Sequence, residues 1–286
     1  TGDLVLTDGT ASADGNAISA NGSGNVLVQA ISGNVLANAN ADIRSGTGSI
    51  SVLASGSITL SAGADVLTGA AGSIDVLATA GSVSMSTISN LTTQTGSLRV
   101  QAGTDITVGR LSTSGNASLT AGGSLLDADA NGDSVVNIVA GGLRLIAGNA
   151  IGSGANAIET TVTTLSARAG TGGVFVTETD GLTVGDVTVS IARVGADALT
   201  TAVTDTTQSD IATTANGNVV LRSTTLPLAV VAMSDWVVSV TAVVSASAPT
   251  RAMLTVTSPT VRTSVAVTDT PPVPERALRR VTVVSK

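Results

Sequence analysis

The chain of 286 residues contains no cysteine and no histidine, and it has one tryptophan, one phenylalanine and no tyrosine. The absence of cysteine excludes disulfides and thiolate metal sites, and the absence of both residue types excludes Ser–His and Cys–His catalysis. A spherical core of this size normally uses aromatic side chains to fill its volume. Valine, isoleucine, leucine and alanine must fill the interior instead, which favours a narrow core of stacked aliphatic rows.

Charged residues are also scarce: they make up 12% of the chain, and the net charge is −7. Nucleic-acid binding needs clustered lysine and arginine side chains against the phosphates, so we expect no nucleic-acid partner. The chain begins with Thr1 and has no basic segment followed by an apolar one at its start. We therefore interpret it as a piece of a longer polypeptide, with any targeting signal or membrane contact in regions outside it.

One short phrase recurs at a fixed interval between Gly24 and Gly103. It reads GNVLVQA, GSISVLA, GSIDVLA and GSLRVQA, starting at Gly24, Gly48, Gly72 and Gly96, so the starts are 24 residues apart. In each phrase, aliphatic residues alternate after a glycine and a small polar residue, which is the period of a β-strand. A repeat of this length with strand-type alternation predicts a β-solenoid.

Each period contains two clear strands and a third, weaker one. In one period the inward-facing residues are Ile50 and Val52, then Ile58 and Leu60. Three short strands in a coil of about 20 to 26 residues indicate an all-β protein, a right-handed parallel β-helix, over residues 1–222. The third strands of successive periods are expected around Val66, Ile88 and Leu111.

The interval loosens after residue 115. The stretch Gly172–Val189 is expected to supply two more strand pairs. Asp127–Asp133 and Asp197–Asn216 are expected to be insertions. Insertions in a solenoid emerge as loops on one face, which is often the binding face.

The composition changes near Gly217, because every glycine lies in residues 1–217 and all six prolines follow. Residues 223–286 form an atypical tail that cannot continue the same turn chemistry. Three interpretations remain open: a small β-domain or cap, a disordered end, or sequence not homologous to the rest. Within the tail, Leu226–Ala248 is apolar enough to suggest a membrane span, but Asp235 near its centre would cost ~3 kcal/mol or more there.

The sharpest local motif is an acidic stretch after residue 126. Asp127, Asp129, Asn131 and Asp133 place oxygen side chains at positions 1, 3, 5 and 7 around a glycine at position 6. This pattern resembles the first half of a calcium-binding loop, although position 12, where a bidentate glutamate belongs, is Ile138. Calcium is therefore the candidate cofactor, and the alternative is an Asx-rich turn between two strands.

A carboxylate-based glycosidase is the enzyme class that this composition still allows. It needs two acids at a defined separation. Aspartates such as Asp8, Asp65 and Asp105 instead occupy turn positions, where they accept hydrogen bonds from backbone N–H groups. Sugar-binding clefts also commonly stack rings on tryptophan or tyrosine, and the single aromatic residue of residues 1–217 is Phe175. We therefore expect that the chain is not an enzyme.

Three further phrases extend the repeat pattern: GSITLSAG, AGTDITVG and AGNAIGSGANAIETTVTTLSARAGTGGVFVTETDGLTVGDV. Together with the GSIxV and GSLxV phrases, they resemble the filamentous-haemagglutinin-type exoproteins over residues 1 to about 222. Members of that family are very large secreted bacterial adhesins whose shafts are right-handed parallel β-helices. The resemblance implies an extracellular or outer-surface location and a shaft that presents adhesive regions.

The sequence therefore predicts a structural shaft segment of a bacterial adhesin. The implied partner is a receptor or glycan on a host or neighbouring cell. Two alternatives remain: a β-helical protein that binds or degrades carbohydrate, and an inert structural spacer.

Overall fold

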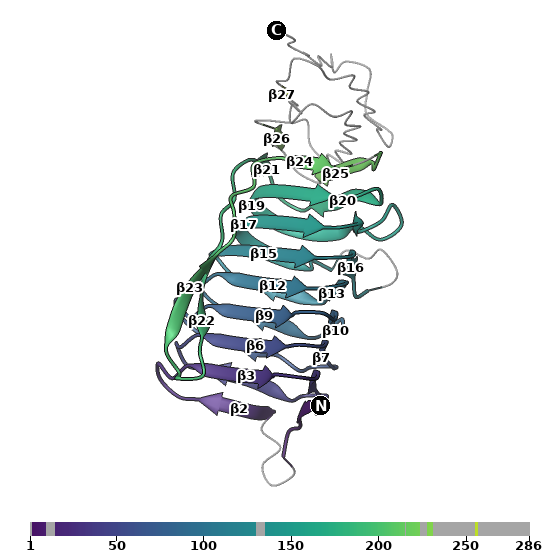
Figure 1. Cartoon of the computed structure of the whole chain (residues 1–286). Helices are drawn as coiled ribbons and strands as arrows, with labels where there is room; N and C mark the ends of the chain where they lie inside the picture. Colours follow the sequence, from purple (N-terminus) through teal and green to yellow (C-terminus); the bar gives the residue numbers. More distant parts are fainter. Residues whose placement is uncertain are drawn as a thin grey trace.

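The computed structural model describes residues 2–9, 15–129, 135–214 and 216–223, together with the backbone of residues 228–230 and 255–256. In these residues the secondary structure consists of strands and turns, without a helix. Apart from one antiparallel hairpin, the strands pair in parallel with those of the next coil and stack along one axis (Figure 1). The predicted all-β parallel solenoid is confirmed.

The repeated phrases form the first sheet of the β-helix. Val28 pairs with Val52, Val52 with Val76, and Val76 with Val100, so each phrase is one layer of the sheet. The sheet stacks β3 (Val26–Ala30), β6 (Ile50–Ala54), β9 (Ile74–Ala78), β12 (Leu98–Ala102) and β15 (Asn116–Ala121), followed by the longer strands β17 (Ile138–Ala147) and β19 (Ile158–Ala169).

Two further sheets complete each coil. The second stacks β1 (Leu4–Leu6), β4 (Val35–Ala37), β7 (Ile58–Leu60), β10 (Val83–Met85), β13 (Ile106–Val108), β16 (Leu125–Asp127), β18 (Ala150–Ile151), β20 (Gly173–Glu178) and β25 (Val219–Ser223). The third stacks β2 (Asn16–Ala20), β5 (Asp42–Ser45), β8 (Val66–Leu67), β11 (Asn90–Thr92) and β14 (Arg110–Ser112), and continues into the first residues of β17 and β19.

The interior is filled by aliphatic side chains that repeat along the axis. In the first sheet, Ile50 and Ile74 are fully buried and Leu98 is 1% exposed, and these three side chains stack in register. A parallel row consists of alanines, among them Ala54 and Ala78. Because each row holds side chains of similar size from the same position of successive coils, the interior packs closely without aromatic residues. The predicted narrow aliphatic core is confirmed.

The glycine at the head of each phrase is required by the contact between coils. A Cβ added to Gly72 would lie 2.4 Å from the carbonyl oxygen of Gly48, and one added to Gly96 would lie 2.0 Å from that of Gly72. Hydroxyl groups bind the same carbonyls: Thr68 Oγ1 donates to Gly48 (2.5 Å) and Thr93 Oγ1 donates to Gly72 (2.6 Å). The recurring glycine thus marks a close approach of backbone to backbone.

One predicted strand position is wrong. The third strand of the coil that contains β10 is centred on Leu91, which is fully buried and pairs with Val66. Ile88, the expected centre, is 55% exposed in the turn before it. That turn is fixed by a hydrogen bond from the N–H of Ser89 to the carbonyl of Ser86, so the strand starts later than hydrophobicity alone suggests.

An inserted hairpin leaves the stack near its upper end. Val184, the last residue of β21 (Leu182–Val184), pairs with Leu165 of β19. Ile211, the first residue of β24 (Ile211–Thr213), pairs with Ala167 of the same strand. Residues 185–210 therefore take the place of one residue, the one that would lie opposite Ser166. We call residues 185–210 the clasp.

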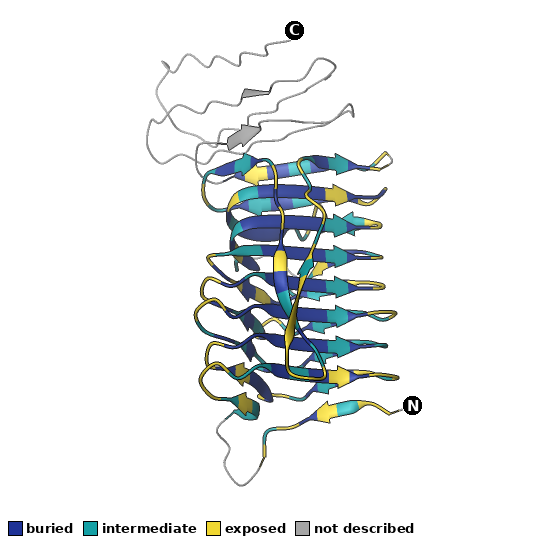
Figure 2. Ribbon diagram, turned by 60° about the vertical axis from the view of Figure 1, so that its left-hand side comes forward, coloured by how far each residue is buried: buried dark blue, intermediate teal, exposed yellow. Residues whose placement is uncertain are grey.

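The clasp folds back over the outer face of the first sheet (Figures 1 and 2). Its strands β22 (Ser190–Val194) and β23 (Thr200–Thr204) pair with each other in antiparallel fashion. The predicted insertion at Asp197–Asn216 is thus misplaced, because Ile211–Thr213 is already back in the stack. The prediction that Gly172–Val189 supplies two strand pairs to the coils is also wrong at its end: Val187 and Val189 are buried within the clasp.

Most of the predicted tail, residues 223–286, lies outside the described residues. The exceptions are Ser223 and two short strands: β26 (Leu228–Val230) pairs with β21, and β27 (Thr255–Val256) pairs with β26. The boundary at residues 222 and 223 stays a prediction. Of Leu226–Ala248, only β26 is described, and none of the described elements is a helix of the length and hydrophobicity needed to cross a membrane.

Candidate functional site

The predicted calcium loop begins at the end of β16. Asn131 and Asp133 lie outside the described residues. Oδ1 of Asp127 accepts hydrogen bonds from the N–H of Asp129 (3.0 Å) and from Nδ2 of Asn137 (2.7 Å), which is the geometry of an Asx turn. Among the described residues, no cluster of three or more potential metal-ligating acids occurs. The calcium site therefore stays a prediction.

A small pocket adjoins this turn. Its lining includes Ile88, Arg110, Asp127 and Asn137, and its volume is about 110 Å³. This volume admits a few water molecules, whereas sites for small organic ligands are typically about 300–1,000 Å³. The pocket is therefore smaller than a typical site for a small organic ligand.

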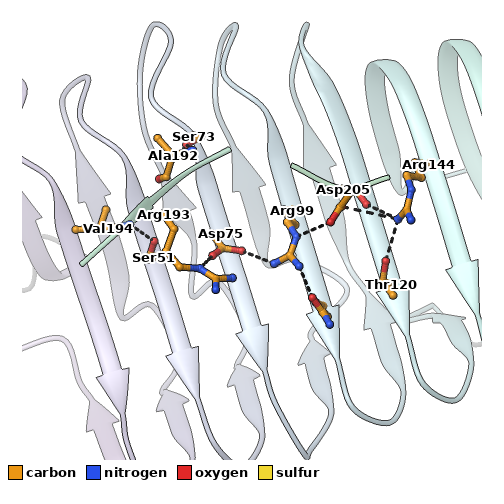
Figure 3. A network of polar contacts seen from close by, with 12 residues as sticks. Ser51, Ser73, Asp75, Arg99, Thr120, Arg144, Ala192, Arg193, Val194 and Asp205 are labelled. Carbon is orange, nitrogen blue, oxygen red and sulfur yellow. Dashed lines mark hydrogen bonds and ion pairs between the residues drawn. The ribbon is translucent and has the colours of Figure 1, made fainter. Parts of the chain in front are cut away.

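A chain of alternating charges joins the clasp to the first sheet (Figure 3). Asp75 is fully buried; its Oδ1 accepts from Arg99 Nη1 (3.1 Å) and its Oδ2 from Arg193 Nε of the clasp (2.5 Å). Arg99 Nε donates to Oδ1 of the clasp residue Asp205 (3.0 Å), and Arg144 Nη1 lies 3.8 Å from Asp205 Oδ2. We call these five residues the charge ladder.

The charge ladder is largely shielded from water. Arg99 is 9% exposed and Arg144 is 5% exposed. Burial lowers the pKa of Arg144, while the charge of Asp205 opposes this effect. Arg144 is also bound by neutral groups: Nη1 donates to Thr120 Oγ1 (3.1 Å) and Nε to the carbonyl of Thr206 (3.0 Å). Such dense pairing is what buried ionised groups require.

Neutral hydrogen bonds attach the edge of β22 that faces away from β23. The N–H of Ala192 donates to Ser73 Oγ (2.8 Å), and the N–H of Val194 donates to Ser51 Oγ (2.9 Å). These serines come from successive coils. Their hydroxyls accept the hydrogen bonds of the β22 backbone N–H groups that a third strand would otherwise accept. Beneath the hairpin, Val187, Val189 and Ile191 form a second, small apolar cluster with Val203.

Sequence reasoning did not identify the charge ladder. Its only sequence signal lies in the phrases GSIDVLA and GSLRVQA, which put Asp75 and Arg99 at the same position of consecutive repeats. Opposite charges on adjacent strands in register form a favourable pair. The clasp residues Arg193 and Asp205 are 118 and 106 residues away from the partners that they contact.

Another buried acid lies near the upper end of the interior. Glu178 is fully buried and stacks on Thr160, in a row that is aliphatic in lower coils. Its Oε2 accepts from Thr160 Oγ1 (2.7 Å), and its Oε1 accepts from the N–H groups of Val162 and Asp180 (3.1 Å each). Burial raises the pKa of Glu178, and the hydrogen bonds from Thr160 and the two backbone groups oppose this effect in part.

Asp65 and Asp105 accept backbone hydrogen bonds, but from residues of the next coil and not, as the sequence predicts, from the neighbouring backbone of their own turns. Asp105 Oδ1 accepts from the N–H of Ser124 (2.6 Å), and Asp65 Oδ1 accepts from the N–H (2.8 Å) and Nδ2 (3.0 Å) of Asn90. Burial raises the pKa of Asp65 despite the bonds from Asn90. These carboxylates therefore connect successive coils.

Comparison with family models, with curated proteins and with solved structures found no match to this chain. The resemblance to filamentous-haemagglutinin-type exoproteins therefore stays a prediction from the repeat pattern.

Proposed function

We propose that the chain is a structural shaft segment of a large bacterial adhesin that is secreted or held at the cell surface. One observation carries the proposal: parallel layers continue from β1 to β25 around an aliphatic interior. Each coil is hydrogen-bonded to the coils before and after it, which gives a stiff rod rather than a globule with a central cleft.

The turns supply the surface that a shaft can present to a partner. Paired residues of the first sheet are 24 residues apart from Ile50 to Leu98, but the next interval, Leu98 to Ala117, is 19 residues and the one to Leu143 is 26. The strands keep their register across these intervals. The variation is thus confined to the turns, where binding residues are commonly carried. The proposed partner is a receptor or glycan on another cell.

The state of two fully buried acids, Asp75 and Glu178, favours a shaft over a carbohydrate-degrading enzyme. Asp75 has both oxygens bound to arginines, and Glu178 accepts bonds from three different residues inside the fold. A glycosidase needs one carboxyl group free to protonate the leaving group and a second one at a defined distance. Neither Asp75 nor Glu178 is available for that role.

An adhesion assay tests the proposal. Beads coated with the folded full chain should bind host or bacterial cells, whereas beads coated with heat-denatured chain should not. A glycan array and a polysaccharide-degradation assay on the same preparation separate the alternatives. Cleavage of a polysaccharide would replace the proposal with the carbohydrate-active alternative, and folded chain that binds no cell and no glycan would reduce it to an inert spacer.

A further inference from the structure

The clasp makes contacts of a kind that a solenoid otherwise lacks. In a stack of coils each unit contacts only its neighbours, so its stability is a sum of local terms and its ends can open independently. The clasp is rooted between β21 and β24, and its tip reaches the layer of β3, where Asn25 Nδ2 donates to the carbonyl of Ala198 (3.0 Å). Those two residues are 173 positions apart in the chain.

Its remaining contacts are distributed over the layers between these ends. The coils of β6, β9, β12, β15 and β17 each offer at least one outward-facing polar side chain to the clasp. From the lower to the upper coil, the contacts are Ser51 with Val194, Asp75 with Arg193, Arg99 with Asp205, Asn116 with Thr188 and Arg144 with Thr206.

The coils do not need the clasp in order to stack. Val184 and Ile211 flank a single position of the layer, so one residue in place of 185–210 would continue the strand as Ser166 does in β19. Conversely, the clasp needs the coils. A two-stranded hairpin is marginally stable alone in water, and its docking groups come from several separate layers. The order of dependence is therefore coils first and clasp second.

We propose that the clasp is a conformational device that docks after the coils have formed and couples the layers from β3 to β21 into one cooperatively opening unit. Asp205 is its central contact, because it lies between Arg99 and Arg144 in the charge ladder. Removing its charge leaves two largely buried arginines facing each other. This inference concerns the stability of the rod and does not depend on the adhesive function.

Hydrogen exchange in increasing concentrations of denaturant measures the opening of each layer separately. In the native chain, we expect amides of β6, β9, β12 and β15 to exchange through one common opening. In a variant with residues 185–210 replaced by a single serine, we expect exchange rates graded from the ends of the stack, differing by about tenfold or more between end and central layers.

Two single substitutions make the test independent of whether the deletion variant folds. Asp205→Asn removes the central charge and should produce the same grading in a milder form. Asp186→Asn removes an exposed acid from the same clasp and should behave as the native chain. Graded exchange in the native chain would overturn the proposal, as would a single common opening in the deletion variant or in Asp205→Asn.

Discussion

The coils from β3 to β12 and those from β15 upward follow the same stacking, but only the lower ones repeat in sequence. In the first sheet, the residues in register are spaced at 24 throughout the lower coils. The spacings above them range from 19 to 26, and the spacing is 44 where the clasp intervenes. Backbone pairing and inward aliphatic residues therefore define a layer, and the length of its turns does not. The repeat period is sufficient for this fold but is not required by it.

The two regions also differ in that a segment of the upper region covers the outer face of the lower one. The irregular upper region contributes the clasp, whose strand β22 lies against the outer face of β6 and β9 in the regular region. Ser51 and Asp75, on that face, are fully buried although they point away from the interior. The regular coils are thus covered by a segment encoded more than a hundred residues later.

The largest expected effect on stability comes from comparing two isoleucines, one in the aliphatic core of the coils and one in the small apolar cluster of the clasp. Ile74→Ala opens a cavity in the aliphatic row of the regular coils and should lower the free energy of unfolding by about 2–5 kcal/mol. Ile191→Ala makes the same change inside the clasp and should release the Ala192 and Val194 amides first, while the coils stay folded. Urea unfolding followed by circular dichroism, with hydrogen exchange of the clasp amides, measures both. If both substitutions destabilised the coils equally, the core of the coils and the apolar cluster of the clasp would not be separate.

The next effect compares two glycines. Gly72→Ala forces a Cβ against the carbonyl of Gly48 and should cost about 1–3 kcal/mol, because neighbouring layers must separate. Gly154→Ala is the control, since the atom nearest to its added Cβ is 3.7 Å away, on Phe175. Thermal denaturation of both variants should lower the melting temperature only for the Gly72 change. A neutral Gly72→Ala would mean that the glycine repeat does not reflect close stacking.

A smaller, pH-dependent effect is expected at the upper end of the interior. The raised pKa of Glu178 means that the folded state binds its proton more tightly than the unfolded chain does. This contribution to stability is complete below the unfolded pKa of about 4.3 and is lost as pH rises through the folded pKa. Relative to native chain, Glu178→Gln should therefore gain stability between acidic and neutral pH. If the denaturation midpoints of the native chain and of Glu178→Gln changed with pH in the same way over this range, the raised pKa of Glu178 would be contradicted.

The smallest expected effect concerns the acidic loop after β16. If it binds calcium, the cation should raise the melting temperature of the native chain, and replacing Asp129 and Asp133 together by alanine should abolish that rise. Magnesium at the same concentration is the control for a non-specific ionic effect. The absence of any calcium-dependent rise in the native chain would leave the Asx turn as the sole role of Asp127.

The inward rows could be predicted because strand alternation and the repeat period both identify them, as for Ile50, Ile74 and Leu98. Hydrophobicity alone does not place the third strand, because Ile88 and Leu91 are close together in the sequence; the pairing of Leu91 with Val66 decides between them. The clasp could not be predicted from hydrophobicity. Val187, Val189 and Ile191 alternate as a coil strand does, and alternation does not reveal which face of which sheet a strand covers.

The most direct test of the layered stack is a set of distances between spin labels on its outer surface, which the absence of native cysteine makes straightforward. Val5, Leu36, Thr59, Ser84, Thr107 and Leu126 occupy one outward row of the second sheet in consecutive layers. With one label at residue 126 and the other at residue 59, 36 or 5, we predict separations of about 14, 19 and 24 Å, increasing by ~4.8 Å per layer. Separations that do not increase in this order would contradict the stacked rod.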